Sequence, residues 1–298
     1  MDLSQFKAYL EAVDRSPKTI NGYLRDLKHF SHWFKISNGI TFTPQDLTKI
    51  DGREYRQFMT TVEKASPATV NRKLSALRAY GEWTVTTGIF DTNPIAGLRG
   101  VREQNPGIRW LEKREQAALL RQLEKEVNAA KTDAAINTAV RNRCIVTLLL
   151  NTGVRIGELC ALTLDDLDLS DRKGQLTIRE GKGRKTRTVP LNHQARTALT
   201  EWSKIRPQAE FDTLFSGRRG NGLTPNAVQR FLSELGRVVG IKVTPHSLRH
   251  TFCKNLINAG VSLEKVAALA GHESIQSTRR YVEPGAVDLE RAVAMLEE

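Results

Sequence analysis

The second half of the chain carries a tyrosine and several cationic side chains whose types suit chemistry on a phosphate. Tyr281 is one of five tyrosines, is the only one beyond residue 80, and directly follows Arg279 and Arg280. A tyrosine within reach of several cations can have its phenolate form favoured, and it can then act as a nucleophile. A packing tyrosine with a hydrogen-bonded hydroxyl is the plainer interpretation of Tyr281 taken alone, so its neighbours must decide.

Two histidines and an arginine lie in the segments that precede Tyr281. His246 and Arg249 are three residues apart at the predicted start of a helix, and this spacing places them on one face. The N-terminus of a helix attracts phosphate through its free N–H groups and its dipole. His272 follows Gly271 at the end of the next predicted helix, where it could equally cap that helix.

Two further cations lie in predicted turns. Arg155 follows a glycine-containing turn in Asn151-Thr-Gly-Val-Arg, and Glu158 comes three residues later. Lys182 stands between two glycines at the tip of a predicted hairpin, where the backbone is mobile. Taken singly, Arg155 could be a surface or ion-pair arginine and Lys182 a solvated loop lysine.

A metal site is an alternative use of the same histidines. His246 and His250 are four residues apart on a predicted helix, and His272 could supply a third ligand. No carboxylate in this stretch is spaced to complete such a site, and Arg249 would repel a cation. The pattern therefore favours a phosphate over a metal ion.

The elements that must position these residues follow from hydrophobic spacing. Helices are predicted after Ser16-Pro17 and after Ser66-Pro67, because each pair supplies an N-cap followed by proline in the first turn. A shorter helix is predicted over residues 51–62. The two long helices carry basic side chains outside their apolar faces. These side chains could form a solvated face, but because two helices share the pattern we expect a DNA-facing surface. These candidates are Lys18, Arg25, Arg72, Lys73 and Arg78.

Turn dipeptides over residues 91–109 place a domain boundary near residue 105, giving a helical domain over 1–105 and a second domain over 106–298. Alternating β-formers in 167–179 and 185–191 predict a hairpin or a small antiparallel sheet. The expected fold class is therefore mainly α with a small antiparallel β-sheet. Helices of the second domain are predicted over 112–127, 135–151, 225–239, 247–259, 262–270, 274–281 and 287–296.

Composition narrows the class of partner. The 298 residues include 45 basic and 33 acidic side chains, and the net charge of +12 indicates a polyanion as partner. There is no apolar stretch of about 20 residues that could span a membrane, and no secretory signal. The cysteines Cys144, Cys160 and Cys253 are odd in number and form no CxxC pair, so a reducing cytoplasm is the expected compartment.

Taken in order, the candidate residues resemble the signature of the tyrosine site-specific recombinases, the lambda-integrase superfamily, in the two-domain form of its Xer-like members. The resemblance covers nearly the whole chain, and no catalytic position departs from the pattern. The segments that carry it are Asn151–Leu159, Gly181–Leu191, His246–Phe252, Gly271–His272 and Tyr281.

The resemblance implies a role for each residue. Tyr281 attacks the scissile phosphate and forms a 3′-phosphotyrosyl bond, while Lys182 protonates the leaving 5′-oxygen. Glu158 orients or buffers the arginine cluster. No metal, ATP or other cofactor is required. The charge that develops on the non-bridging oxygens is stabilised by Arg155, Arg249, His246 and His272.

The resemblance also implies the partners. The first domain corresponds to a SAM-like core-binding domain that grips one face of double-stranded DNA while the catalytic domain grips the other. Four copies, or copies together with a paralogous recombinase, pair two sites made of inverted half-sites. The predicted helix 287–296 either docks on a neighbouring copy or packs on its own domain. Neither the target sequence nor the choice between chromosome dimer resolution and mobile-element integration follows from these residues.

Two alternative functions share some of these features. A type IB topoisomerase would use the same chemistry but relax DNA as a monomer. A non-catalytic regulator is suggested by residues 261–281, which superficially resemble a helix-turn-helix. The regulator would not explain why Arg155, Lys182 and the His246–Arg249 pair occur in family order.

Overall fold

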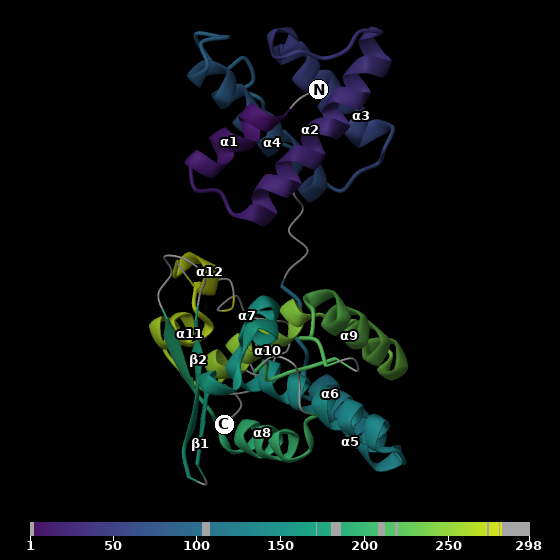
Figure 1. The fold of residues 1–298 in the computed structure, drawn as a ribbon, viewed down its shortest axis with the longest axis vertical. Coiled ribbons are helices and arrows are strands. Elements are labelled where there is room, and N and C mark those ends of the chain that lie inside the picture. The colour runs from purple at the N-terminus through teal and green to yellow at the C-terminus, as the bar shows by residue number, and fades with distance from the viewer. Residues whose placement is uncertain are drawn as a thin grey trace, which may run out of the picture. The chain divides into compact units, whose positions relative to one another are not determined.

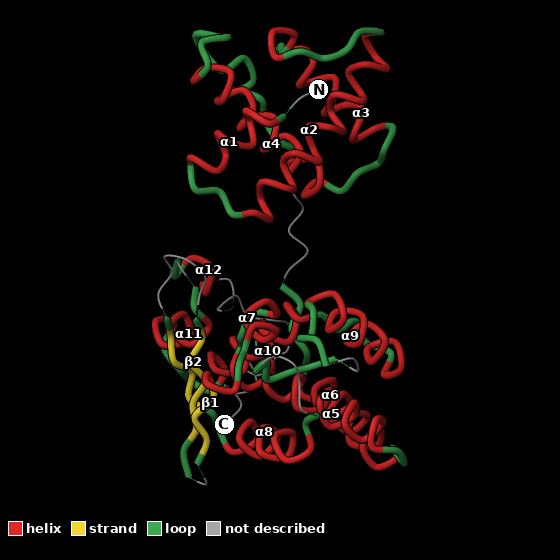
Figure 2. The backbone as a smooth tube through the Cα atoms, viewed as in Figure 1, coloured by secondary structure: helices red, strands yellow, loops and turns green. Residues whose placement is uncertain are grey.

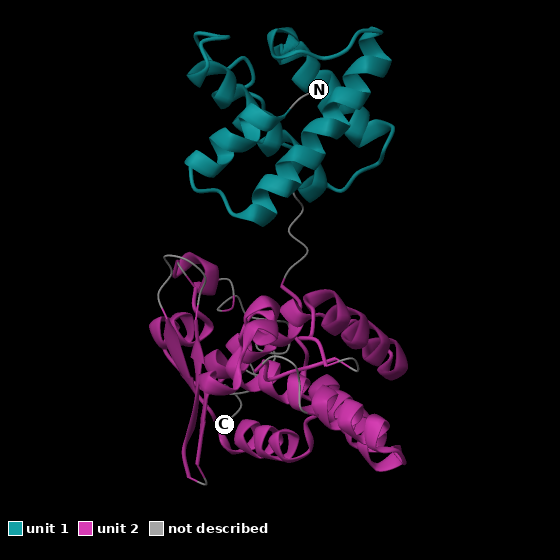
Figure 3. Ribbon diagram, viewed as in Figure 1, with its two compact units in different colours: residues 1–106 teal, residues 107–298 magenta. Residues whose placement is uncertain are grey.

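The chain divides into two compact units, residues 1–106 and residues 107–298 (Figure 3). Each unit is described by itself. The computed structural model describes residues 3–102, 108–170, 172–179, 186–207, 212–217, 220–272, 274–279 and 281.

The N-terminal unit is helical (Figure 1). Its two long helices begin as predicted, because the hydroxyls of Ser16 and Ser66 accept hydrogen bonds from the backbone N–H groups of Thr19 and Thr69. Both α2 and α3 pack against α4. The elements of this unit are α1 (Ser4–Ala12), α2 (Pro17–Asn38), the 3₁₀ turn η1 (Pro44–Asp46), α3 (Lys49–Thr61) and α4 (Pro67–Thr86).

Aromatic side chains fill the core of the N-terminal unit. The ring of Phe30 meets Tyr55 and Phe42 edge-on, each with centroids 5.0 Å apart. Such edge-to-face pairs are favoured over stacked ones by the ring quadrupoles. Because α2, α3 and the η1 region each contribute a ring, this cluster fixes how the helices of the unit pack.

The C-terminal unit combines helices with one small sheet (Figure 2). Strands β1 (Leu167–Leu169), β2 (Gly174–Ile178) and β3 (Arg187–Pro190) are antiparallel in the order β1-β2-β3. The helices are α5 (Lys113–Ala129), α6 (Asp133–Thr152), α7 (Ile156–Ala161), α8 (His193–Ile205), α9 (Pro225–Val239), α10 (Pro245–Asn258), α11 (Leu263–Ala270) and α12 (Gln276–Arg279), with a 3₁₀ turn η2 (Leu164–Asp166).

Helix α6 forms the centre of this unit. Cys144, Ile145 and Leu149 on α6 are fully buried, and α6 packs against α5, α8 and α10. Helix α10 carries the segment His246–His250, so its packing on α6 fixes that segment relative to the end of α6. The core thus positions the end of α6 and the start of α10, which hold residues of the candidate site.

The expected fold class is confirmed: the described part of the chain is mainly helical with a three-stranded antiparallel sheet. Residues 167–179 form two strands rather than one, because the chain turns at Ser170, whose N–H donates to the carbonyl of Lys173. Helix α8 was not predicted, although Ala195, Leu199 and Trp202 are buried at helical spacing. The predicted helix 287–296 lies outside the described residues.

No helix of the described residues is both long enough and apolar enough to cross a membrane.

Candidate active site and DNA-facing surface

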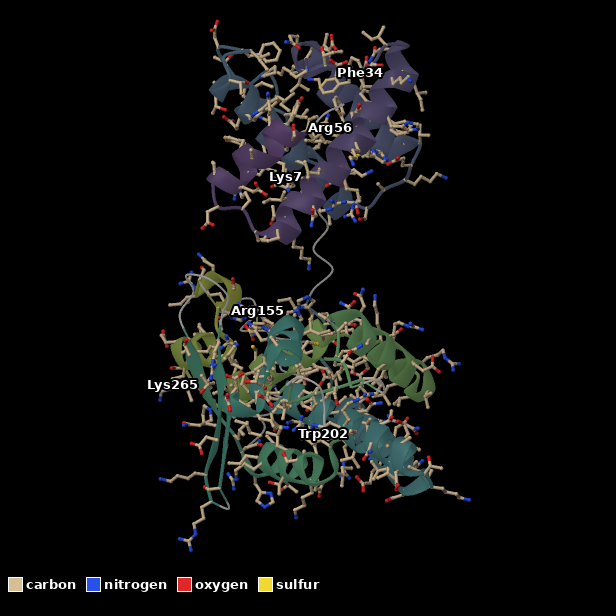
Figure 4. All side chains as sticks on the ribbon, in the orientation of Figure 1. Lys7, Phe34, Arg56, Arg155, Trp202 and Lys265 are labelled. Atoms are coloured by element: carbon tan, nitrogen blue, oxygen red, sulfur yellow. The ribbon has the colours of Figure 1, made fainter. Side chains whose placement is uncertain are left out.

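A glycine turn at the end of α6 places Arg155. Gly153 has a φ of +61°, in the left-handed region that glycine adopts most easily, and it ends α6. The ring of Phe252 on α10 packs so closely on Gly153 that a Cβ would clash with it. Arg155 then becomes the N-cap of α7, and it is labelled beside that helix in Figure 4.

The carboxylate of Glu158 joins two arginines. It accepts from the backbone N–H of Arg155 and from the Nη1 of Arg155, each at 2.7 Å. It also accepts from the Nη1 and Nη2 of Arg187 at 3.0 and 2.7 Å. The Nη2 of Arg155 donates in addition to the carbonyl of Gly271, the residue before His272. Arg155 is therefore tied to the turn that carries His272.

Arg249 lies on the other side of the same glycine turn. Its Nη1 donates to the carbonyl of Gly153 at 2.5 Å, and the residue is only 5% exposed. Burial, and then the nearby charge of Arg155, lower the pKa of Arg249 from its ordinary value. The negative charge of a bound phosphate would act against both causes of this lowered pKa.

The proposed nucleophile lies among imidazole rings. The hydroxyl of Tyr281 is hydrogen-bonded to the Nδ1 of His250 at 2.6 Å, and the ring of His246 lies 6.3 Å from that of His250. The ring of His272 stacks on Tyr281 at 6.2 Å and is held by a 2.8 Å hydrogen bond between its Nδ1 and Thr278.

Tyr281 is held at both ends. Its side chain is 2% exposed and packs with Phe252 and Cys253 of α10. Its carbonyl accepts from the buried Nζ of Lys254 at 3.5 Å, and the same ammonium lies 4.9 Å from the centre of the Trp110 ring. Burial raises the pKa of the Cys253 thiol to about 11, although a hydrogen bond with Tyr281 acts in the opposite direction.

The structure thus brings six sequence-predicted residues to one end of α10. These residues are linked by hydrogen bonds, either directly, as between Arg155 and Glu158, or through Gly153, Gly271 and His250. Lys182 and the rest of the predicted hairpin tip lie outside the described residues. The six residues are Arg155, Glu158, His246, Arg249, His272 and Tyr281.

Burial alone would raise the pKa of Glu158. The hydrogen bonds from Arg187 and Arg155 outweigh it, so the pKa lies below its ordinary value. The carboxylate therefore stays ionised among the arginines. One negative charge facing the guanidinium groups of Arg155, Arg187 and Arg249 leaves an excess of positive charge.

Three of the candidate DNA contacts line one groove on the N-terminal unit. The groove, of about 760 Å³, is formed by the first turns of α2 together with α4, and Lys18, Arg25 and Arg72 line it. Lys18 and Arg25 are exposed. Arg72 is 43% exposed and forms an ion pair with Asp26, which is buried.

The two remaining candidates have partners inside the unit. Lys73 is 11% exposed and pairs with Glu63 at 3.3 Å, and its Nζ also lies 3.0 Å from His29. Arg78 donates through Nη2 to the carbonyl of Leu98 at 3.1 Å. Both side chains stabilise the packing of the unit in this conformation.

Two residues at the site were not singled out as candidates by the sequence. His250 was considered only as a metal ligand, and the structure places it against the Tyr281 hydroxyl. Arg187 comes five residues after Lys182 in the sequence, and its ion-pair partner Glu158 could not be known from spacing. Across the described ranges, no group of three or more His, Cys, Asp or Glu side chains is arranged to hold a metal.

The chain thus has a helical N-terminal unit and a second unit in which hydrogen bonds and ring contacts link two arginines, two histidines and a tyrosine. These are features of a DNA strand-transferring enzyme. The chain belongs to the phage integrase family of tyrosine recombinases: residues 110–286 match the phage integrase family, and residues 3–88 match its N-terminal SAM-like domain. It is an enzyme of site-specific recombination. This membership favours the recombinase over the regulator and the topoisomerase.

Two curated relatives illustrate the similarity. Tyrosine recombinase XerA of Pyrococcus furiosus is 31% identical over 297 residues, covering 98% of this chain and 92% of the relative. Tyrosine recombinase XerC of Xanthomonas campestris pv. campestris is 31% identical over 282 residues, covering 93% and 82%.

A solved structure shares the fold. XerH recombinase bound to a palindromic difH substrate, in a post-cleavage complex, is 22% identical with a TM-score of 0.76, covering 98% of this chain and 85% of that one.

Proposed function

We propose that this enzyme cleaves and rejoins duplex DNA at specific sites through a 3′-phosphotyrosyl intermediate formed by Tyr281. The observation that supports this most is the position of the Tyr281 hydroxyl, which lies among imidazole rings. The cluster that contains it carries an excess of positive charge. A phosphate bound at Arg155 and Arg249 would meet the charges that stabilise its transition state, and the proposal has Tyr281 move from its covered position to attack it.

The proposed step exchanges one phosphodiester for another. The bond between the Tyr281 oxygen and phosphorus forms as the bond between phosphorus and the 5′-oxygen breaks. The phenolic proton passes to a nearby base, and the leaving 5′-oxygen receives a proton, for which we propose Lys182 as donor. Rejoining reverses each transfer. Because the new diester conserves the energy of the old one, no ATP is needed, and the proposal gives the charge stabilisation that a metal could supply to the arginines and histidines.

We assign Arg155, Arg249, His246 and His272 to the non-bridging oxygens. Arginine suits this role because its planar guanidinium can donate two parallel hydrogen bonds to a phosphate. Glu158 holds Arg155 in place. In the present structure Arg155 donates to the carboxylate of Glu158 and to the carbonyl of Gly271, and Arg249 donates to the carbonyl of Gly153.

We propose that residues 1–105 form a core-binding domain and residues 106–298 the catalytic domain. The groove lined by Lys18, Arg25 and Arg72 receives the phosphate backbone. Four copies pair two sites made of inverted half-sites, residues 287–296 of one copy dock on its neighbour, and the enzyme acts in the cytoplasm. The solved relatives named as DNA complexes support duplex DNA as the partner.

The test separates recombination from relaxation. A binding site is first selected by the protein from a random-sequence duplex library. A plasmid carrying two copies of the site is then incubated with the enzyme without metal or ATP. The proposal expects deletion or inversion of the segment between the sites. Relaxation of a plasmid with one copy, without recombination of the two-site plasmid, would support the monomeric topoisomerase instead.

A further inference from the structure

We propose that Arg187 is a positioning residue of this active site, whose guanidinium aims Arg155 at the scissile phosphate. The inference rests on the proposed function, because it assigns Arg155 to that phosphate. Arg187 is the first residue of β3 and follows the segment that contains Lys182. It contacts two groups that accept hydrogen bonds from Arg155.

The first of these groups is the carboxylate of Glu158. Each of its oxygens accepts two hydrogen bonds, one from Arg155 and one from Arg187. A carboxylate has about four acceptor sites in all, so Glu158 is saturated. The parallel bonds from Arg187 fix the plane of the carboxylate. Without them Glu158 could rotate, and the Nη1 of Arg155 would lose a fixed acceptor.

The second group is the carbonyl of Gly271, which accepts from the Nη2 of Arg155. The guanidinium of Arg187 packs on this glycine so closely that a Cβ at position 271 would lie 2.6 Å from its Cζ. Gly271 has a φ of +67° and ends α11, just before His272. Arg187 therefore supports the turn that supplies both a hydrogen-bond acceptor for Arg155 and the backbone of His272.

The exposure of the three side chains assigns their roles. Arg187 is 13% exposed and Glu158 is 10% exposed, whereas Arg155 is 39% exposed. Arg155 is the most exposed of these three side chains, and both terminal nitrogens of Arg187 already donate to Glu158. A buried ion pair is a weak source of net stability, so we expect its main effect in the orientation of Arg155.

Lysine cannot replace Arg187 in this arrangement. An ammonium is a point charge without the fork that binds both oxygens of a carboxylate. Arg187→Lys keeps the charge of the cluster and removes the fixed plane of Glu158. The inference therefore expects Arg187→Lys to be impaired nearly as much as Arg187→Gln, whereas a purely electrostatic role expects the lysine variant to retain most of the rate.

The experiment measures single-turnover cleavage of a nicked suicide duplex that contains the selected site, together with its affinity by gel shift. We expect both Arg187 variants to cleave about 10- to 100-fold more slowly, the usual range for a residue that orients an active-site ligand. Their dissociation constants should stay within about threefold of wild type, because the proposed role of Arg187 acts on the cleavage step rather than on DNA binding.

A matched control isolates this effect from lost stability. Arg143 is 19% exposed, belongs to the same unit and pairs with Glu124 and Glu201, away from the site. Arg143→Gln also removes a paired arginine from this unit and should cleave at the wild-type rate. The melting temperature of each variant is measured, and all cleavage rates are compared at a temperature where every variant is folded. If Arg187→Gln does not fold, Arg187→Lys decides the question by the same comparison.

A double-variant cycle tests the route of action. If Arg187 acts through Arg155, then Arg187→Lys should slow an Arg155→Lys enzyme by less than about threefold. The inference would be overturned if the two substitutions slowed cleavage independently, so that their fold-losses multiplied in the double variant. Cleavage by Arg187→Lys at the wild-type rate would overturn it as well. Failure of the wild-type enzyme to form any covalent adduct would instead overturn the proposed function, so the two failures are distinguishable.

Discussion

The hydroxyl of Tyr281 and the Nδ1 of His250 are hydrogen-bonded at 2.6 Å, and this bond holds the side chain in a site where it is 2% exposed. A phenol so deeply covered is out of reach of a phosphate in a DNA duplex. Attack therefore requires Tyr281 to leave the surface of α10. That movement would uncover Cys253, which packs in the same small cluster.

Cys253 should report the release of Tyr281. Burial raises the pKa of its thiol to about 11, so only about one thousandth is thiolate at pH 8. We expect iodoacetamide to label Cys253 at least about fivefold faster when the selected duplex is added, as measured by mass spectrometry. Cys144, buried in the core around α6, should stay unlabelled. Equal labelling of Cys253 with and without DNA would show that Tyr281 stays in place.

The groove on the N-terminal unit predicts which cations bind DNA. Lys18→Ala and Arg25→Ala should each weaken binding and reduce the slope of log affinity against log salt by about one. Arg78→Ala removes a hydrogen bond to the carbonyl of Leu98 instead. It should lower the melting temperature and leave the salt slope unchanged. Gel-shift titrations at several salt concentrations measure the slopes, and a reduced slope for Arg78→Ala alone would contradict the assignment.

Gly153 should be less replaceable than another helix-ending glycine. Gly153 and Gly240 both have positive φ, at +61° and +76°, but only Gly153 lies against Phe252. Gly240→Ala should cost about 1–2 kcal/mol for the left-handed backbone. Gly153→Ala should cost at least about 1 kcal/mol more, measured by urea unfolding of the C-terminal unit. Equal costs would mean that the Phe252 ring yields without strain.

The contribution of Glu158 to stability should disappear in acid. Its folded-state pKa lies below the ordinary value of 4.5, so its contribution is complete above that pH and decreases as the pH falls further. Glu158→Gln should therefore melt below wild type at pH 7, and the gap should narrow below about pH 4.5. Thermal melts between pH 7 and 3.5 test this. A gap that widens in acid would contradict the direction of the pKa shift.

Local signals predicted much of this fold. The caps at Ser16 and Ser66 involve residues three positions apart, and the start of each helix follows from them. Helix α8 was overlooked, although the spacing of its buried side chains was a usable signal. The partners of Lys73 and Arg78 could not be predicted, because they come from elsewhere in the folded unit.

At the candidate site, residue identity and order were predictable, whereas contacts were not. The hydrogen bond between His250 and Tyr281 joins residues 31 positions apart. The side chain of Arg187 on β3 reaches Glu158, 29 positions away in the first turn of α7, a contact that no spacing rule encodes. The sequence could therefore indicate which side chains take part in the chemistry, but not which groups restrain them.

The most direct test of the central claim identifies the residue that carries the DNA. A suicide duplex with the selected site is incubated with the enzyme, and the covalent product is digested and sequenced by mass spectrometry. Tyr55 is a matched control, since its buried hydroxyl is also hydrogen-bonded to a histidine Nδ1, that of His29, at 2.7 Å. Wild type and Tyr55→Phe should yield a peptide with the nucleotide on Tyr281, and Tyr281→Phe should bind DNA without forming any adduct. An adduct formed by Tyr281→Phe, or a nucleotide on another residue of the wild-type enzyme, would contradict the account.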